Sequence, residues 1–258
     1  SGANLQGAHL WRSNMARSNF NEAFMAGCTL GRTNLSNSVM KGVDLQGSAI
    51  SFSNLSYTDL VRADLSGTDL SQPDLSWAHL SGANLRNARL VGANLDMADL
   101  TGSDLQGAIF INAKMSSTSV SQATFGLTTI SNCDLTGVIG LGDARHVGPS
   151  MIGLDTISQS KGQVNVKFLQ GAGVPPLLIS AQDALRDSGM TFNRVLLLGS
   201  GSDSEFADKL RAGLAEANVP SWIICVDDEA SLTSGATNLD DAVVLSLRHN
   251  RRRRRTPS

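Results

Sequence analysis

Residues 81–105 read SGANL-RNARL-VGANL-DMADL-TGSDL, which is one five-residue plan written five times. The fifth residue of each block is leucine, the third is alanine or serine, and the fourth is asparagine, aspartate or arginine. The same register runs without a break from Ser1 to Leu135, so the chain contains 135/5 or 27 consecutive blocks. A repeat of this length decides the fold of the first half of the chain.

A period of five residues excludes the two common regular structures. It is too long for one helical turn and does not match strand alternation, so neither an α-helix nor a flat sheet buries every fifth residue. A chain that turns a corner every five residues would bury one large and one small side chain from each block. The other three side chains would face solvent.

The triplets Ala-Asn-Leu at residues 83–85 and 93–95 and Ala-Asp-Leu at 98–100 resemble the motif of the pentapeptide-repeat family. The resemblance implies a mainly β fold, a right-handed quadrilateral β-helix with four blocks per coil. Residues 1–139 would then form about seven coils. At about 4.8 Å per coil, the rod would be roughly 30 Å long.

The coil length predicts which side chains stack on the outer wall. Tyr57, Trp77 and Met97 occupy the second position of blocks twenty residues apart, so they should project from one side of three successive coils. Large apolar side chains grouped on a surface usually have a partner, and we interpret these three as partner-binding residues that receive either the C-terminal half of the chain or another chain. The alternative is a ladder that stabilises the coil by self-stacking. A second, interrupted column is a weaker candidate and carries Trp11, Phe52, Val91 and Ile111.

The charge distribution argues against an acidic surface. The chain has a net charge of −2, and residues 1–139 carry eight basic and ten acidic residues, 8 − 10 = −2. Asp59, Asp64, Asp69 and Asp74 are five apart and therefore ring the rod on four different faces. Some pentapeptide-repeat proteins are strongly acidic DNA mimics that inhibit topoisomerases, and that function is a second alternative here. We expect neither nucleic acid nor a membrane as a partner, since no window approaches 18 apolar residues.

The residues that carry chemistry form no motif in this sequence. Cys28, Cys133 and Cys225 are widely spaced, which predicts buried, reduced thiols in the cytoplasm rather than disulfides or metal ligands. The four histidines are scattered, and no triad can be argued. We therefore predict no catalytic residue, no metal and no cofactor in the repeat.

The first coil has no capping element before Ser1. An open β-helix end exposes backbone donors and acceptors. We expect either that upstream residues are missing or that two rods meet at this end, which predicts homo-oligomerisation.

The second half of the chain is predicted to be built differently. Residues 140–190 read as a connector that caps the last coil. Continuous apolar runs at 194–199, 221–226 and 242–247 are typical of buried parallel strands, and residues 204–218 have an amphipathic helical pattern. Strand, helix and strand in this order predict a small α/β unit over residues 191–250, followed by a basic tail at 251–258.

This unit resembles the start of a Toll/interleukin-1 receptor (TIR) domain, through the Gly-Ser-Gly-Ser-Asp loop at 199–203, Phe206, Leu210 and Trp222. Residues 146–150, 154–156 and 168–175 look like the connector of bacterial proteins that join pentapeptide repeats to such a domain. The resemblance implies signalling contacts or hydrolysis of NAD by a glutamate. No Ser-x-Trp-x-x-Glu segment follows Leu247, and Glu229 follows the wrong strand.

The sequence thus predicts a non-catalytic scaffold joined to a partial TIR-like domain. The first alternative is an NAD-hydrolysing effector in bacterial defence. Ser200, Ser202 and Asp203 are weak candidates for cofactor binding, because the loop at 199–203 also resembles the phosphate-binding turn of the aminoimidazole ribonucleotide carboxylases.

Overall fold

A computed structural model describes residues 2–176, 178–180 and 182, together with the backbone of three later strands. The chain divides into two compact units, Ser1–Asp183 and Ala184–Ser258. Its regular elements, in chain order, are β1 (Ile109–Ile111), β2 (Thr124–Phe125), β3 (Thr129–Ser131), a 3₁₀ turn (Leu141–Asp143), β4 (Arg145–His146), β5 (Met151–Ile152), α1 (Leu154–Gln159), α2 (Val166–Gly171), β6 (Arg194–Gly199), β7 (Ser221–Cys225) and β8 (Ala242–Ser246).

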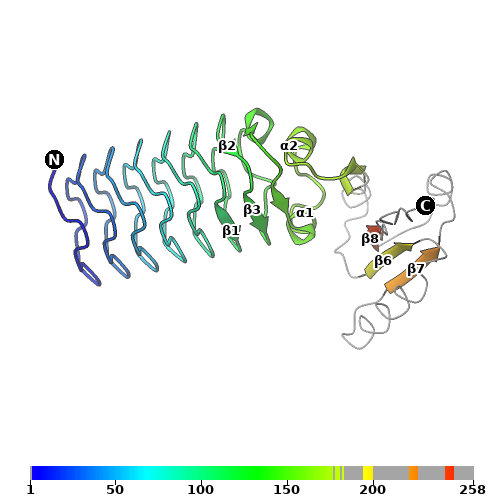
Figure 1. The fold of residues 1–258 in the computed structure, drawn as a ribbon, viewed down its shortest axis with the longest axis horizontal. Helices are drawn as coiled ribbons and strands as arrows, with labels where there is room; N and C mark the ends of the chain where they lie inside the picture. The colour runs from blue at the N-terminus through cyan, green and yellow to red at the C-terminus, as the bar shows by residue number, and fades with distance from the viewer. Residues whose placement is uncertain are drawn as a thin grey trace, which may run out of the picture. The chain divides into compact units, whose positions relative to one another are not determined.

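The first unit is a stack of coils in which neighbouring chain segments are twenty residues apart (Figure 1). The first coil makes four parallel bridges to the second, namely Asn4↔Phe24, His9↔Thr29, Asn14↔Asn34 and Asn19↔Val39. The same spacing recurs as far as Ser119↔Ile139. The expected mainly β solenoid with four blocks per coil is therefore confirmed.

The core consists of the fifth and third residues of the blocks. Every fifth residue from Met25 to Leu105 is 0% exposed. Third-position hydroxyls are buried without loss of hydrogen bonding: Thr58 Oγ1 donates to the carbonyl of Leu35 at 3.0 Å. Cys28 and Cys133 also lie at this position as buried free thiols, and burial raises the pKa of Cys133 to about 11. The repeat thus fills its interior while leaving few polar groups unpaired.

Each corner is shaped by the second and fourth positions. The second residue has a positive φ, for example 61° at Gly42, a region that glycine enters at little cost. The fourth residue is often asparagine or aspartate because its side chain accepts from the backbone two residues later. Asp44 Oδ1 accepts from the Gln46 N–H at 3.1 Å. This short hydrogen bond stabilises the turn that follows each bridge.

The ladder continues past residue 139 with a changed spacing. β4 pairs with β2 through Thr124↔Arg145, 145 − 124 = 21 residues apart. β5 pairs with β3 through Thr129↔Met151, 151 − 129 = 22 residues apart. Each added residue lengthens a turn, the first at the 3₁₀ turn, so the five-residue pattern is lost although the chain still coils. The predicted domain boundaries at residues 139, 190 and 250 stay predictions.

Two short helices close this end of the coil. The Thr156 hydroxyl of α1 accepts from the Cys133 N–H at 3.3 Å, and the Ser160 hydroxyl accepts from the Leu135 N–H at 2.9 Å. Both hydroxyl residues are 0% exposed. On α2, Phe168 packs edge-on against Phe125, with 5.1 Å between the ring centroids. The helices therefore supply both the hydrogen bonds and the apolar cover that the last coil lacks.

His146 lies inside this closure and predicts a pH effect. Its ring packs on Phe125 and Phe168, and neither ring nitrogen has a hydrogen-bond partner among the described residues. Burial lowers the pKa of His146, so the unfolded state binds a proton at a higher pH than the folded state does. Stability should therefore be full above the unfolded pKa of about 6.5 and fall as the pH drops below it.

The measurement is thermal unfolding between pH 7.5 and pH 5.5 for the wild type and for His146→Phe, which keeps an aromatic ring but cannot be protonated. We expect the midpoint of the wild type to fall more steeply with decreasing pH. Parallel pH profiles for the two proteins would exclude His146 as the cause.

The second unit contains a three-stranded parallel sheet with the strand order β7-β6-β8. The three strands lie within the apolar runs that predicted them. β6, which comes first of the three along the chain, is the central strand. The predicted helix at 204–218, the loop residues Ser200, Ser202 and Asp203, and the tail at 251–258 lie outside the described residues. Among the described residues, no helix combines the length and apolar character that a membrane crossing requires.

Candidate protein-binding surface

The predicted strip of Tyr57, Trp77 and Met97 lies on the outside of one corner of the coil. Their exposed fractions are 54%, 47% and 45%. The Tyr57 and Trp77 rings are stacked, with centroids 5.8 Å apart and planes 5° from parallel. The coil therefore presents a flat aromatic pair to solvent, with a thioether beside it.

The strip shares its backbone conformation with the other second-position residues of the repeat. All three residues have a positive φ, 56° at Tyr57, 59° at Trp77 and 63° at Met97, which costs a residue other than glycine about 1 kcal/mol. A different corner of the same coils carries glycine at positions 7, 27, 47, 67 and 107. The fold thus accepts glycine at this position, so it does not require large side chains there. The positive φ is a property of the repeat, so the size, apolar character and exposure of these three side chains are what distinguish the strip.

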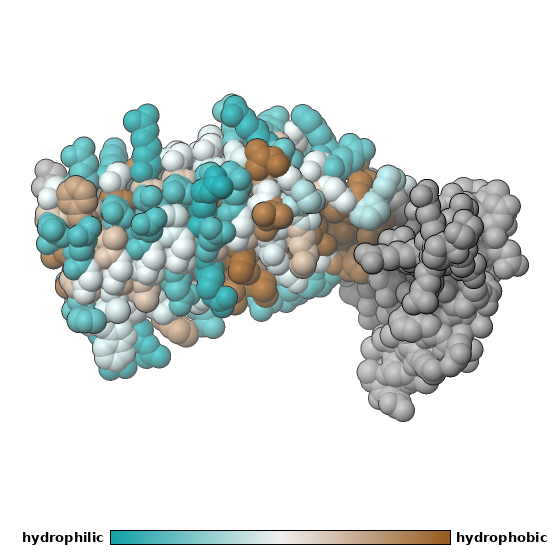
Figure 2. Space-filling model, viewed as in Figure 1, coloured by the Kyte–Doolittle hydropathy of each residue, from teal (hydrophilic) through white to brown (hydrophobic). Residues whose placement is uncertain are grey.

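In the weaker column, arginine side chains lie over the aromatic rings. The Arg12 guanidinium lies 4.1 Å from the centre of the Trp11 ring, and the Arg32 guanidinium 5.5 Å from that of Phe52. A Cβ on Gly31 would lie 3.1 Å from Trp11 Cδ1, so this ring packs along the coil wall. Figure 2 shows one face of the unit, where polar side chains surround separate apolar patches. Of the two columns, the strip is the one without such arginine cover.

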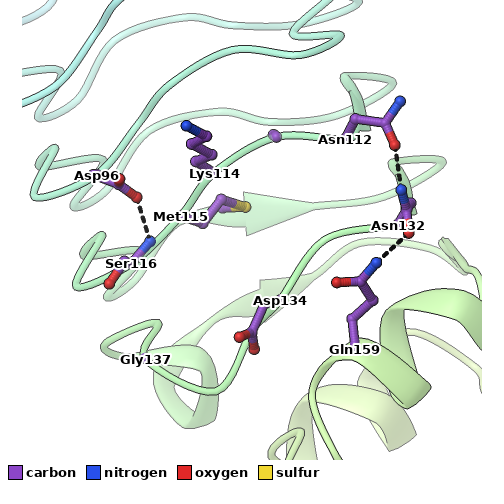
Figure 3. Close-up of a pocket in the computed structure, with 10 residues that line it drawn as sticks. Asp96, Asn112, Lys114, Met115, Ser116, Asn132, Asp134, Gly137 and Gln159 are labelled. Carbon is purple, nitrogen blue, oxygen red and sulfur yellow. Dashed lines mark hydrogen bonds between the residues drawn. The ribbon is translucent and has the colours of Figure 1, made fainter. Parts of the chain in front are cut away.

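A polar hollow of about 410 Å³ lies near the closed end of the coil (Figure 3). Its rim carries charged and amide side chains, and Ala113 and Met115 form an almost buried floor. Asp96 Oδ1 accepts from the Ser116 N–H at 2.8 Å. The lining residues are Asp96, Asn112, Ala113, Lys114, Met115, Ser116, Asn132, Asp134, Gly137 and Gln159.

The hollow coincides with a break in the backbone ladder. One coil earlier, the Leu95 N–H donates to Lys114 O at 2.8 Å, and the Lys114 N–H donates to Ala93 O at 2.9 Å. The equivalent bonds between Met115 and Asp134 and between Asp134 and Ala113 are missing within the described part of the chain. The Met115 N–H, the Ala113 carbonyl and the Asp134 N–H therefore face the hollow without a backbone partner.

The hydrogen bonds on both sides of Asp134 keep the direction of the regular repeat. The N–H groups of Cys133 and Leu135 donate to hydroxyls of the closing segment, which takes the place of a next coil. The Asp134 side chain folds onto its own turn, where Oδ1 accepts from the Thr136 N–H at 2.9 Å. The break is therefore confined to Asp134 and the residues opposite it in the preceding coil, and the hollow lies there.

A chain of amides borders the hollow on its other side. Asn132 Nδ2 donates to Asn112 Oδ1, and Gln159 Nε2 of α1 donates to Asn132 Oδ1 (Figure 3). No sequence signal predicts this site, since the block Ser131–Leu135 fits the repeat as well as any other. In the part of the chain that the structure describes, no three His, Cys, Asp or Glu side chains are grouped to hold a metal ion.

Comparisons with known proteins concern the repeat. The family model for pentapeptide repeats matches residues 1–37, 18–51, 33–72, 50–87 and 74–107. No curated protein matches the chain. The matches give no support to the TIR resemblance, which stays a prediction.

Several solved structures resemble the chain. Rfr23, a pentapeptide-repeat protein from the cyanobacterium Cyanothece 51142, is 33% identical over 43% of this chain and 80% of its own, with a TM-score of 0.27. HetL from Nostoc sp. strain PCC 7120, involved in heterocyst differentiation regulation, is 24% identical over 56% and 70%, with a TM-score of 0.25. A trypsin-treated form of QnrB1, a plasmid-mediated fluoroquinolone resistance protein, is 17% identical over 67% and 84%, with a TM-score of 0.45. The repeat, the family match and the identity to Rfr23 together show that this chain belongs to the pentapeptide-repeat family.

Proposed function

We propose that the chain is a non-catalytic scaffold that binds a protein partner through the strip of Tyr57, Trp77 and Met97. The observation that carries this proposal is the exposed, parallel-stacked pair of Tyr57 and Trp77 at a block position that glycine fills in other blocks. Aromatic side chains of this kind are the residues that most often dominate the binding energy of protein interfaces. The printed roles of HetL and QnrB1, regulation and resistance, are compatible with this view.

Carboxylates surround the strip and favour a partner with basic groups. Asp59 is held by Lys41 at 3.1 Å, but Asp96 and Asp99 make no ion pair within the described residues. Burial alone would raise the pKa of Asp99, yet hydrogen bonds from Ser81 and Thr101 outweigh it and hold that pKa below its usual value. Asp99 therefore remains charged at neutral pH.

The test compares the double variant Tyr57→Ser/Trp77→Ser with the matched control Trp11→Ser. A protein captured by the wild type, then purified and titrated directly, should bind the double variant at least about 30-fold more weakly, since loss of a hot spot costs 2 kcal/mol or more. The control should bind normally. The melting temperature should stay nearly constant in both, and a large fall in the double variant would instead support the self-stacking interpretation.

The first coil is a second candidate surface, through self-association. Its inward side chains Leu5, Leu10, Met15 and Phe20 are only partly buried, while later ones are fully buried. Dimerisation through this coil would bury them further. A particle mass that stays monomeric at high protein concentration would count against this contact.

The second unit supports a further candidate. Strand order β7-β6-β8, with the first strand in the centre, is the beginning of a doubly wound sheet, which is compatible with a TIR-like domain. NAD turnover that is lost on changing Asp203 would favour the effector alternative over the scaffold. Protection of DNA supercoiling would favour the topoisomerase-inhibitor alternative.

A further inference from the structure

The strip and the hollow lie on the same corner of the coil. Tyr57, Trp77 and Met97 are corner residues of three successive coils, and Asp96 precedes Met97 directly. Asp96, Ser116 and Gly137 line the hollow. They lie at this same corner in three successive coils, the first of which carries Met97. The apolar strip therefore leads along the rod directly into the polar hollow.

We propose that strip and hollow form one track that binds an extended segment of a protein partner, with an arginine side chain of that segment in the hollow. The proposal rests on the proposed function and adds the chemical identity of the bound segment. From Tyr57 to Gly137 the corner advances four coils, or about 19 Å, which equals about six residues of extended chain. A short linear segment is thus long enough to cover both parts.

The free acceptors in the hollow match a guanidinium group. Asp96 and Asp134 each use Oδ1 in a hydrogen bond to their own corner, and no described residue donates to either Oδ2. The Ala113 carbonyl likewise has no backbone partner among the described residues. Arginine offers five N–H donors in a fixed plane and is only weakly hydrated, so it can satisfy several acceptors at once. The almost buried Met115 would lie under the aliphatic stem of the side chain.

The charge of Lys114 offers a second test of the proposed arginine site. Its ammonium group lines the same hollow and makes no ion pair with any described residue. It therefore opposes the entry of a second cation and leaves the hollow with two carboxylates and one ammonium group. Neutralising Lys114 should strengthen the binding of arginine, whereas neutralising either carboxylate should weaken it.

The probe is an acetylated, amidated hexapeptide with phenylalanine and leucine at alternate positions and arginine at one end, synthesised in both directions. Its partner probe replaces arginine by citrulline, which has the same shape without the charge. We expect one direction of the arginine peptide to bind the full chain at least about tenfold more tightly than its citrulline analogue. Isothermal titration at fixed salt measures both.

Substitutions in the hollow test whether it causes the preference for the arginine peptide. Asp96→Asn combined with Asp134→Asn keeps both backbone hydrogen bonds to Oδ1, across the coils at Asp96 and within the turn at Asp134, and should abolish the preference for arginine. Asp44→Asn is the matched control for Asp134, since Asp44 makes the same turn bond on another face of the rod. Lys114→Gln should increase the affinity for the arginine peptide several-fold. No measurable binding at millimolar peptide, or an arginine preference that survives in the double variant, would overturn the proposal.

Trp77→Ala separates this proposal from the proposed function. If the strip binds the apolar residues, this variant weakens the arginine and citrulline peptides by the same factor and leaves their ratio unchanged. If Trp77→Ala has no effect while the ratio still depends on Asp96 and Asp134, the hollow binds arginine and the strip is not a binding surface. If Trp77→Ala weakens both peptides but the wild type binds them with equal affinity, the strip is a binding surface and the hollow is not an arginine site.

Discussion

The Leu85→Ala variant should unfold with a free energy lower by about 2 to 5 kcal/mol. Leu85 is 0% exposed and occupies the fifth position of a central coil, between Leu65 and Leu105 of the adjacent coils. Truncation removes three carbons from a wall that stacked coils hold in place, so the space can close only partly. Urea denaturation monitored by circular dichroism measures the change.

The matched control is Leu127→Ala. Leu127 belongs to the same repeat but is 77% exposed, and its truncation should change the free energy of unfolding by less than about 0.5 kcal/mol. Equal effects of the two substitutions would contradict the assignment of fifth-position residues to the core.

Phe168→Ala should open the closed end of the coil. The Phe168 ring is 1% exposed and packs against Phe125 and His146. Removing a buried phenylalanine ring lowers the free energy of unfolding by about 3 to 5 kcal/mol. We expect this loss to destabilise mainly the segment that closes the coil. Since each coil contacts only its neighbours, the first coils should be little affected.

Hydrogen exchange resolved by peptide mass spectrometry distinguishes local from global effects. We expect faster exchange in residues 133–171 of the variant and unchanged exchange before residue 100. Val166→Ala on the same helix is the control, because Val166 is 44% exposed. Uniformly faster exchange along the whole unit would show that the rod unfolds as one cooperative body.

The regular half of the fold could be predicted because its cause is local. Each block repeats the same small and large inward residues, so the period and the outward direction of Trp77 follow from counting, and the resemblance to the pentapeptide-repeat family adds the coil length of four blocks. The three strands of the second unit were predictable for a similar reason, since continuous apolar runs need burial on both sides. The order in which they pair required the structure.

The closed end and the hollow could not be predicted from the sequence, because their causes are contacts between distant residues. Asp134 has the residue type and position of a regular block, yet it makes no backbone hydrogen bond to the preceding coil in the described part of the chain. Nothing in residues 154–160 marks Thr156 and Ser160 as substitutes for a missing coil. The buried, unpartnered ring of His146 is likewise visible only once Phe125 and Phe168 surround it.

The twenty-residue spacing between bridged residues also determines how this surface can change over generations. Insertion or loss of twenty residues moves everything downstream by one step of about 4.8 Å along the axis and keeps each side chain facing the same direction. A change of five residues instead rotates every later side chain by a quarter turn around the axis. The coil would survive such an edit, but the Tyr57–Trp77 pair and the hollow would then face different directions. Two contacts on one corner therefore stay on the same side of the rod only if the number of residues between them changes by whole coils. Only such changes preserve a binding surface that spans several coils.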